Sequence, residues 1–353
     1  MSRVYIIIVN WNGWKDTIEC LESVFRSDYN DYRVIVCDNN SSDGSVERIK
    51  AWAGNRLDLL AEVGGRLRDR SFPPVVKPIS YATYAQEEAE SGGCLEDDSP
   101  LILIRNTSNL GFAGGNNVGM RYALARHDFD YVWLLNNDTV VNPDSLSRLV
   151  YRMRQKNGAG MCGSTLLHYN DPDRVQALGG GYYCKWIGLP WHQGRLRKSG
   201  STVDKTKVER WMNYIIGASM LVSKEFLQNI GLMCEDYFLY FEELDWAIRG
   251  KGSFSLAFAP ESVVYHKIGS SIGTSSNPWE KSLNCDYYNI RNRLFFTRRY
   301  FPYSLPAIYA VLFGTLLLRI FMWKWDRVRM IAGLLLNYNK HTFEKMSEIS
   351  SST

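Results

Sequence analysis

The sequence lacks the patterns that mark several common classes of protein. Seven cysteines are scattered along 353 residues and none forms a CxxC pair, which argues against a zinc site. Their odd number favours reduced thiols in a cytosolic protein. The net charge is only +4, so no strong basic surface for nucleic acid is indicated. The apolar run 4–9 is too short for a secretory signal and polar residues follow it at once.

What the sequence does contain is typical of a globular α/β protein. Hydrophobic residues make up 45% and charged residues 22%, and the length suits one large domain with an appendage. The β-branched runs 3–9 and 32–38 each precede a polar loop and a segment with helical spacing of apolar residues. This alternation predicts an open, mostly parallel sheet, in which ligands bind beyond the carboxyl ends of the strands.

The rest of the chain is less uniform. Residues 55–99 are rich in charge, Gly and Pro with weak periodicity, and we interpret them as an inserted excursion. Strand-like runs resume at 101–106 and 131–138, with a glycine-rich loop, 109–117, and a helix between them. From about residue 278 the pattern is helical. We therefore expect one domain over 1–275 and a helical C-terminal region over 276–353.

Three polar clusters follow apolar runs, and each has two interpretations. Asp38, with the polar residues around it, could accept the imide N–H of a pyrimidine base, although the same residue types make ordinary turns. The glycine-rich segment 109–119 could let the backbone approach a phosphate-bearing ligand, or could be a common strand-to-helix turn. Asp138 could hold Mg²⁺ or Mn²⁺ on a diphosphate, or could cap a helix.

A fourth cluster is acidic and lies among aromatic residues. Glu242, Glu243 and Asp245 would raise one another's pKa in such surroundings, so one of them could act as a general base. On a helix, Glu242 and Asp245 share a face and Glu243 points elsewhere. The alternative is a solvated acidic helix start. His266 follows another apolar run and is either a metal ligand or a structural histidine.

Taken in order, these segments resemble the family 2 glycosyltransferases, which have the GT-A fold. The resemblance covers residues 3–53 and about 101–300, and is closest to the branch that builds cell-surface polysaccharides, which includes rhamnosyltransferases. It rests on six motifs: IIIVNWNG, VCDNNSSDGS, NLGFAGGNNVG, WLLNNDTVVNPD, GASMLVSKEFLQNIG with FLYFEELDWAIR, and YYNIRNRLFF.

The resemblance implies a role for each of these clusters. Asp138 and His266 would hold Mg²⁺ or Mn²⁺, and Glu243 would be the base, with Glu242 or Asp245 as the alternatives. Two positions depart from the family pattern, since Asn136 replaces the first DxD carboxylate and Glu243 stands where relatives generally carry Asp. The donor would lie along Val9, Asn10, Asn12, Asp38, Asn40, Asn109, Gly111, Asn116, Asn117, Asn136 and Asn137.

The implied activity is inverting transfer of a sugar from a UDP- or dTDP-sugar to a hydroxyl of a glycan or lipid-linked glycan. Three other functions compete with it: a non-catalytic nucleotide-sugar binder or scaffold of the same fold, a nucleotidyltransferase, and a membrane-anchored structural protein. The nucleotidyltransferase lacks support because NWNG stands where a glycine-rich, arginine-bearing triphosphate loop is expected. No nucleic-acid partner is expected.

The C-terminal region indicates contact with a membrane. The apolar run Leu305–Met322 is followed by Trp323, Lys324 and Trp325, a combination typical of a membrane interface. Arg319 and the short length argue against a span. We expect a peripheral helix on the cytoplasmic face of the cell membrane, with a span and a buried or dimer-forming helix as alternatives. A homodimer is therefore also considered.

Overall fold

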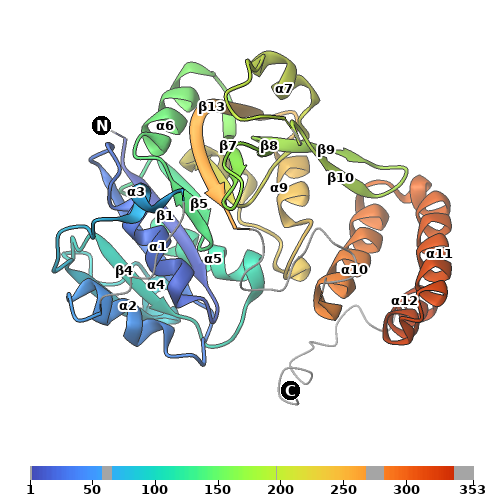
Figure 1. Cartoon of the computed structure of the whole chain (residues 1–353), viewed down its shortest axis with the longest axis horizontal. Helices are drawn as coiled ribbons and strands as arrows, with labels where there is room; N and C mark the ends of the chain where they lie inside the picture. Colours follow the sequence, from blue (N-terminus) through green and yellow to red (C-terminus); the bar gives the residue numbers. More distant parts are fainter. Residues whose placement is uncertain (1, 58–65, 196, 268–281, 338–353) are drawn as a thin grey trace.

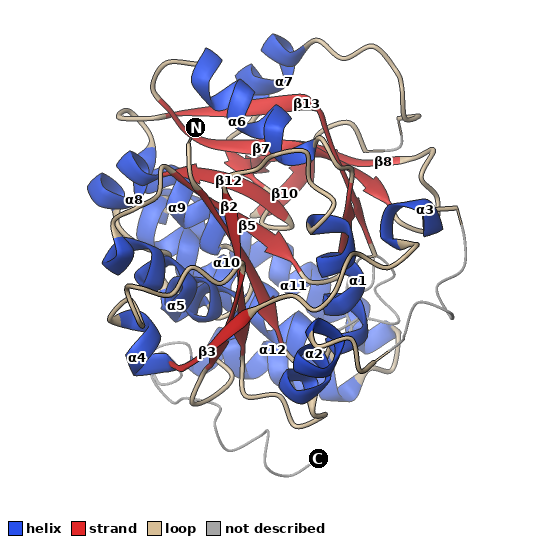
Figure 2. Ribbon diagram, turned by 90° about the vertical axis from the view of Figure 1, so that its left-hand side faces the viewer, coloured by secondary structure: helices blue, strands red, loops and turns tan. Residues whose placement is uncertain are grey.

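The computed structural model describes residues 2–57, 66–195, 197–267 and 282–337. Residues 58–65 of the expected excursion, and 276–281 and 338–353 of the expected C-terminal region, lie outside the described residues. A twisted, mostly parallel sheet runs through the molecule, with helices on both faces (Figure 2). The predicted α/β architecture with C-terminal helices is confirmed.

The central sheet has ten strands within the described residues. Their order is β3 (Tyr81–Ala85), β4 (Leu101–Arg105), β2 (Tyr32–Asp38), β1 (Val4–Asn10), β5 (Tyr131–Asn136), β12 (Ser219–Ser223), β7 (Ala159–His168), β13 (Ser255–His266) and β6 (Thr139–Val141), with β8 (Val175–Leu178) paired to β7. The strands from β3 to β5 are all parallel, whereas β12 runs antiparallel to both of its neighbours. The ends of β1, β2 and β5 therefore meet at one edge of the sheet.

The first strand explains why the sheet has a helix layer on each face. Val4, Ile6 and Ile8 point to one face and Tyr5 and Ile7 to the other, and all five are fully buried. The first face is covered by α1 (Trp14–Val24), α2 (Ser45–Ala53) and α6 (Ser145–Gln155), whose apolar residues belong to the same core. The second face is covered by α5 (Gly111–Arg126), α8 (Lys224–Ile230) and α9 (Glu242–Gly250).

The described part of 55–99 differs from the expected excursion. It contains α3 (Arg68–Ser71), β3 and α4 (Gln86–Glu90), and β3 pairs in parallel with β4 as the outermost strand of the sheet. The sequence YATYA is too short and too little alternating in hydrophobicity to predict this strand. The second half of the segment is therefore part of the fold.

The glycine-rich segment expected to be a loop is instead the start of a helix. The helix α5 begins at Gly111, and two of its glycines, Gly115 and Gly119, face the sheet. A Cβ at Gly115 would lie 2.8 Å from Val9 Cγ1, and one at Gly119 would lie 2.7 Å from Ile7 Cγ2. The glycines thus let the helix lie directly on β1, because any side chain there would collide with the strand.

The remaining elements are a second, smaller sheet and the C-terminal helices. A three-stranded sheet is formed by β9 (Gly180–Cys184), β10 (Leu189–His192) and β11 (Tyr214–Ile215), with α7 (Lys205–Trp211) between β10 and β11. Three helices follow: α10 (Leu283–Tyr300), α11 (Leu305–Phe321) and α12 (Trp325–Asn337). They stand at one side of the molecule, where the β9–β10 hairpin reaches toward α10 and α11 (Figure 1).

Candidate active site

The ends of three parallel strands bring the expected donor-binding residues together. Asn10 at the end of β1 is in register with Asp38 at the end of β2, and Val9 is in register with Asn136 at the end of β5. Asp138 follows two residues after β5. Asn10 is fully buried and Asp38 is 5% exposed, so polar side chains are held inside the protein at this edge. Such an arrangement requires hydrogen bonds, which the neighbouring loops supply.

The two loops after β1 and β2 are joined through the Asp38 carboxylate. Asn10 Nδ2 and the Ser41 hydroxyl both donate to Asp38 Oδ1, each over 2.6 Å, and the Ser41 backbone N–H donates to Oδ2. The backbone N–H of Asn12 donates to the Ser41 hydroxyl in turn. Asn12 and Asn40 are exposed and have φ angles of 49° and 56°. Both are thus displayed at the mouth of the site in the left-handed conformation that asparagine tolerates.

The start of α5 is fixed to the same loops. Asn109 Oδ1 accepts the Gly111 N–H over 3.0 Å, and Asn39 Nδ2 donates to the Gly111 carbonyl over 2.9 Å. A weaker contact of 3.3 Å joins Asn39 Nδ2 to Asn109. Asn109 and Gly111 therefore lie beside the Asp38 loop, as a donor-binding role requires.

Three other asparagines expected at the donor have internal partners. Asn117 is 1% exposed and binds the Met233 backbone through both its amide nitrogen and its oxygen. Asn116, equally buried, donates to a backbone carbonyl one helical turn earlier. Asn137 Nδ2 lies 3.1 Å from the Thr17 hydroxyl at the start of α1. These side chains hold elements together around the site, which their position in the sequence could not reveal.

His266 and Asp138 face each other at the end of the sheet. Imidazole Nε2 lies 3.2 Å from Asp138 Oδ1 and 3.4 Å from the amide nitrogen of Asn136. The other ring nitrogen, Nδ1, lies 3.1 Å from Gln176 Oε1, which can only accept, so Nδ1 carries the hydrogen. In the neutral ring, Nε2 is then an acceptor that points at a carboxylate oxygen. Two acceptors at this distance are favourable when a cation binds between them.

These side chains fit a hard divalent cation with open positions. Asp138 is 4% and His266 is 8% exposed, and antiparallel pairing of β6 with β13 sets His266 opposite Thr139, next to Asp138. Within the described ranges, no group of three or more His, Cys, Asp and Glu side chains gathers to hold a metal. A site of two protein ligands leaves the remaining positions to water and substrate oxygens.

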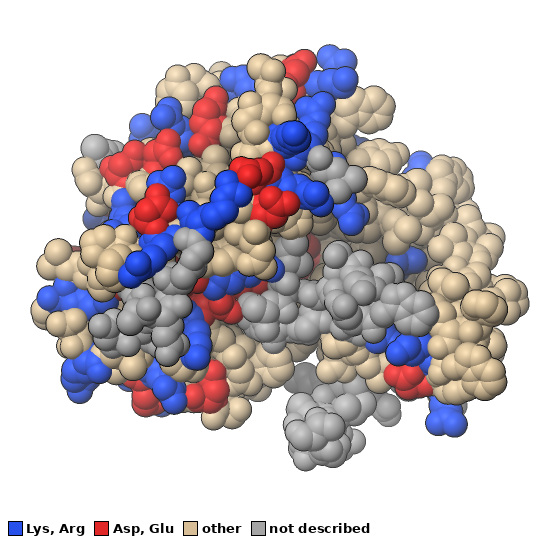
Figure 3. Space-filling model, viewed as in Figure 1, with Lys and Arg blue, Asp and Glu red and all other residues tan. Residues whose placement is uncertain are grey.

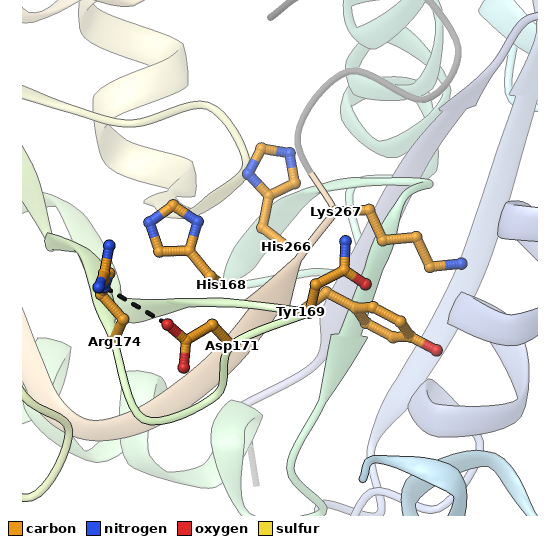
Figure 4. Close-up of a pocket in the computed structure, with 7 residues that line it drawn as sticks. His168, Tyr169, Asp171, Arg174, His266 and Lys267 are labelled. Atoms are coloured by element: carbon orange, nitrogen blue, oxygen red, sulfur yellow. Dashed lines mark ion pairs between the residues drawn. The ribbon is translucent and has the colours of Figure 1, made fainter. Parts of the chain in front are cut away.

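A cavity of about 180 Å³ opens next to His266 (Figure 4). His168, which is in register with His266 on the adjacent strand, lies beside it, and Asp171 forms an ion pair with Arg174 over 3.4 Å. Lys267 also lines the cavity, but its amine pairs with Asp16 and Glu19 on α1. The space beside His266 is thus polar and reachable from solvent.

Glu243 lies in the first turn of α9 and is linked to Asn136 through the backbone of two intervening residues. Its Oε1 accepts the Gly217 N–H over 3.2 Å, and the next residue, Ala218, accepts the Asn136 N–H over 3.1 Å. A Cβ at Gly217 would lie 2.6 Å from Glu243 Oε1 and 2.7 Å from Phe112, so only glycine fits there. This backbone bridge sets the Glu243 carboxylate near the end of β5, where the candidate metal ligands begin.

Burial raises the pKa of both glutamates. Desolvation, followed by repulsion from Glu243, raises the pKa of Glu242 well above its ordinary value. Desolvation also raises the pKa of Glu243. Glu242 is 2% exposed and its Oε2 has no hydrogen-bond partner, whereas Glu243 is half-buried and can be reached by a substrate. The pKa of Glu242 is thus raised further than that of Glu243, and of the two carboxylates Glu243 is the one that a substrate can reach.

Asp245 has a structural environment. It is fully buried and forms an ion pair with Arg249 over 2.7 Å, and its Oδ1 accepts the Tyr300 hydroxyl over 2.6 Å. Tyr237 and Arg299 approach the same oxygen. With both oxygens engaged, this carboxylate links α9 to α10 and has little capacity left to accept a proton from a substrate.

Sequence reasoning missed three residues that support the site. Gln176 orients His266, and Gly217 binds Glu243. Asn292 on α10 is fully buried and donates to three backbone carbonyls immediately before α9. Gly217 and Asn292 left a signal, since they belong to the GASMLVSKEFLQNIG and YYNIRNRLFF motifs, whereas Gln176 lies in a segment without distinctive spacing.

Residues 5–63 and 83–231 match glycosyl transferase family 2, which is more than half of the chain. The chain belongs to this family. The predicted family and the predicted GT-A fold class are thereby confirmed. The match leaves out 64–82, which lie within the expected excursion, and it ends at residue 231, whereas the sequence resemblance was expected to reach about residue 300.

Individual relatives are more distant. The low-salt glycan biosynthesis hexosyltransferase Agl10 of Haloferax volcanii is 25% identical over 163 residues, or 45% of this chain and 48% of that protein. The structure of GalNAc-T7 with UDP, GalNAc and Mn²⁺ has a TM-score of 0.56 at 14% identity, covering 88% of this chain and 50% of that one. The chain thus spans about half the length of both proteins. A mannosyltransferase from Pyrobaculum calidifontis, solved with GDP-Man and Mn²⁺, is 15% identical over 98% of this chain and 88% of that one, with a TM-score of 0.46.

Proposed function

We propose that this protein is an inverting glycosyltransferase in which Glu243 is the general base. The bridge from Glu243 through Gly217 and Ala218 to Asn136 carries the proposal, because it sets a reachable carboxylate beside the metal-binding strand end. The acceptor hydroxyl gives its proton to Glu243 as its oxygen bonds to the anomeric carbon. The bond from that carbon to the diphosphate breaks on the opposite face, and the configuration is inverted.

Asp138 and His266 would hold Mg²⁺ or Mn²⁺ at the diphosphate. The support is the pair of acceptor atoms that face each other over 3.2 Å, together with the orientation of the ring by Gln176. The ion would neutralise charge that develops on the leaving diphosphate. The distantly similar GalNAc-T7 structure contains Mn²⁺ and UDP, which agrees with this choice of ion.

The donor proposed is a UDP- or dTDP-sugar. Asp38, held by Asn10 and Ser41, would accept the imide N–H that uracil and thymine share. Asn12, Asn40, Asn109 and Gly111 surround that position and would contact the nucleotide. We propose that Asn116, Asn117 and Asn137 shape this pocket from behind.

The acceptor proposed is a glycan or lipid-linked glycan of the cell surface. The name of the relative Agl10 describes glycan biosynthesis and hexosyl transfer, which agrees with this class. The rhamnosyltransferase-like branch remains the subgroup that we propose from the sequence motifs.

The test is turnover of a panel of UDP-, dTDP- and GDP-sugars, with Mn²⁺, Mg²⁺ or EDTA. Wild type is compared with Glu243→Gln and Asp138→Ala. We expect one pyrimidine donor to be turned over only with metal, and both variants to be inactive while the donor still binds Glu243→Gln. Full activity of Glu243→Gln would refute the base. Tight donor binding without turnover of any acceptor would favour the alternative, a nucleotide-sugar-binding scaffold.

We also propose that the C-terminal region lies on the cytoplasmic face of the membrane. The segment Pro302–Phe321 is long and apolar enough to cross a bilayer by length and composition, yet only 22% of it is buried in the protein. Replacing Phe321, which is 82% exposed, by Glu should release the protein from membranes. For the domains we propose 1–275 and 276–353, with α10 contributing to the catalytic body through its bonds to Asp245.

A further inference from the structure

We propose that Lys185, Trp186 and Tyr303 form a second membrane anchor, at the corner where the β9–β10 hairpin meets the start of α11. The anchor would insert at the interface of an anionic bilayer and hold the catalytic sheet at a fixed orientation to it. The inference rests on the proposed membrane association of α11 and adds a contact from outside the C-terminal helices.

The corner is a compact cluster with exposed aromatic rings. The Lys185 amine donates to the Tyr303 hydroxyl over 3.0 Å, and the rings of Trp186 and Tyr303 pack edge to face at 5.7 Å. Trp186 is 52% and Tyr303 is 56% exposed. A Cβ at Gly188 in the hairpin turn would lie 2.8 Å from atoms of both Arg293 and Ile308, so the turn packs directly on α10 and α11.

The corner continues an apolar surface along α11. Phe313, Leu317, Leu318 and Phe321 are all at least half exposed, and an uncharged expanse covers the α11 side of the molecule (Figure 3). Exposed tryptophans and a lysine occur again after the far end of α11, as Trp323–Trp325. Aromatic rings and lysines at both ends of an apolar helix are the composition of a membrane interface.

The surface fits a helix that lies in the plane of the membrane better than one that crosses it. Asp286 on α10 pairs with Arg319 on α11 and with Arg327 on α12, so a crossing α11 would carry this ionic cluster into hydrocarbon. The hairpin also holds the start of α11 at the level of the catalytic body. In that orientation both aromatic ends reach the same face of the bilayer.

Charge favours an anionic bilayer over a second copy of the chain. Residues 283–337 contain eight Lys or Arg and two Asp or Glu, of which five basic side chains and one acidic side chain are not buried. Anionic lipid attracts such a region. A symmetric dimer through the same face would bring two like-charged regions together, which is unfavourable.

The test is flotation of the full chain with vesicles of phosphatidylcholine alone or mixed with phosphatidylglycerol. We expect Trp186→Ala with Tyr303→Ala to weaken binding at least about tenfold on both vesicles, because two half-exposed aromatic rings lose their contact. Lys185→Ala should weaken binding about fivefold, on anionic vesicles only. Tyr151→Ala is the matched control, since Tyr151 on α6 is 60% exposed and distant from the corner.

The outcomes separate the anchor from the proposed membrane association. If wild type does not bind either vesicle, the membrane association fails and the anchor with it. If wild type binds and the double variant binds equally well, the anchor is refuted while α11 retains its role. A concentration-dependent dimer in sedimentation that the double variant abolishes would assign the surface to a second copy instead. Unchanged thermal unfolding midpoints exclude misfolding as the cause of a loss.

A separate observation concerns the backbone that leads into the base helix. Phe238, Tyr240 and Phe241 have φ angles of 61°, 69° and 75°, which bulky side chains rarely adopt. The buried Asn292 Nδ2 lies 2.8 Å from the carbonyls of Tyr237 and Leu239 and 3.0 Å from that of Tyr240. One side chain on α10 thus binds the strained segment on which Glu243 depends.

We infer that Asn292 is a positioning residue for Glu243, which rests on the proposed base role. In Asn292→Asp the side chain keeps its shape but cannot donate to the carbonyls when ionised. We expect turnover to fall about a hundredfold, as for a small displacement of a catalytic group. The acid limb of the pH profile should move to lower pH as Glu243 becomes more hydrated. Asn284→Asp, on the exposed first turn of α10, is the control.

A second variant keeps this inference testable if the aspartate unfolds the protein. Asn292→Ala should show the same loss of turnover and the same displaced acid limb. Turnover is normalised to the concentration of protein that still binds the donor. If the variant unfolds at a lower temperature but keeps its turnover and the acid limb of its pH profile, Asn292 stabilises the fold and does not position Glu243. Full activity of Glu243→Gln would instead refute the base itself, so the two failures remain distinct.

Discussion

Imidazole Nε2 of His266 lies 3.2 Å from Oδ1 of Asp138, with Gln176 holding the opposite ring nitrogen. The two residues are 128 positions apart in the chain and meet because β6 and β13 pair at the edge of the sheet. The contact turns an ambiguous histidine into a candidate metal ligand. It also gives Gln176 a role that can be tested, because an imidazole ring that is held in one tautomer binds metal better.

Replacing Gln176 by Ala should weaken the metal site without removing a ligand. We expect the Mn²⁺ concentration for half-maximal turnover to rise about tenfold or more, with turnover largely restored at saturating metal. Gln193→Ala is the control, because Gln193 is a half-buried glutamine nearby that binds the Val208 carbonyl. An unchanged Mn²⁺ requirement in Gln176→Ala would argue that His266 is not a ligand.

The two adjacent glutamates should respond differently to the same change. Glu243→Gln should lower turnover by about 10²–10⁴-fold with donor affinity retained, since a general base is lost. Glu242→Gln should stay active. A base works only when ionised, and the pKa of Glu243 is raised, so wild-type turnover should fall with decreasing pH earlier than for an ordinary glutamate. Because the pKa of Glu242 is raised further than that of Glu243, Glu242 is already protonated where Glu243 titrates, and Glu242→Gln should leave the acid limb of the pH–rate profile in place.

Asp245 should matter for stability more than for the proton transfer. Asp245→Asn leaves Arg249 without its buried partner and should cost about 3–5 kcal/mol of unfolding free energy. Tyr300→Phe removes only the 2.6 Å hydrogen bond and should cost about 1 kcal/mol. Denaturant unfolding measures both. A displaced acid limb in Asp245→Asn, with stability unchanged, would return Asp245 to the list of candidate bases.

The strand ends could be predicted from the sequence because their signals are local. The run Val4–Asn10 is apolar and β-branched and then turns polar, and a parallel sheet brings such ends together. The directions of individual asparagines could not be predicted. Asn109 and Asn117 belong to the same motif, yet the first faces the Asp38 loop and the second faces Met233. Tertiary contacts decide this, and a single sequence does not contain them.

The glycine-rich motif shows the same limit. Gly111, Gly115 and Gly119 recur every four residues, a spacing that is typical of one face of a helix. The low helix propensity of glycine nevertheless led us to predict a loop. The low helix propensity of these glycines is offset by close packing of α5 on β1, whose residues lie more than a hundred positions earlier in the chain. Local propensity was therefore outweighed by packing.

That packing gives a matched pair of substitutions. Gly115→Ala would bring a Cβ within 2.8 Å of Val9 Cγ1 and 3.0 Å of Asn39 Oδ1, so we expect a loss of about 1–3 kcal/mol and a raised KM for the donor. Gly333→Ala, in α12 with nothing within 4 Å of its Cβ, should instead stabilise by about 0.5–1 kcal/mol. Equal effects of both substitutions on thermal unfolding would contradict this account of α5.

The buried Glu242 predicts an unusual dependence of stability on pH. Because its pKa is raised on folding, the folded state binds the proton more tightly than the unfolded state does. Its contribution is therefore fully favourable below the ordinary glutamate pKa and is lost as pH rises through the folded value. Glu242→Gln removes this penalty and should stabilise the protein at pH 8 by about 1–3 kcal/mol, because the unpartnered Oε2 no longer carries charge. At acid pH the variant and wild type should unfold alike. Stabilisation that is equal at both pH values would show that packing, and not ionisation, is the cause.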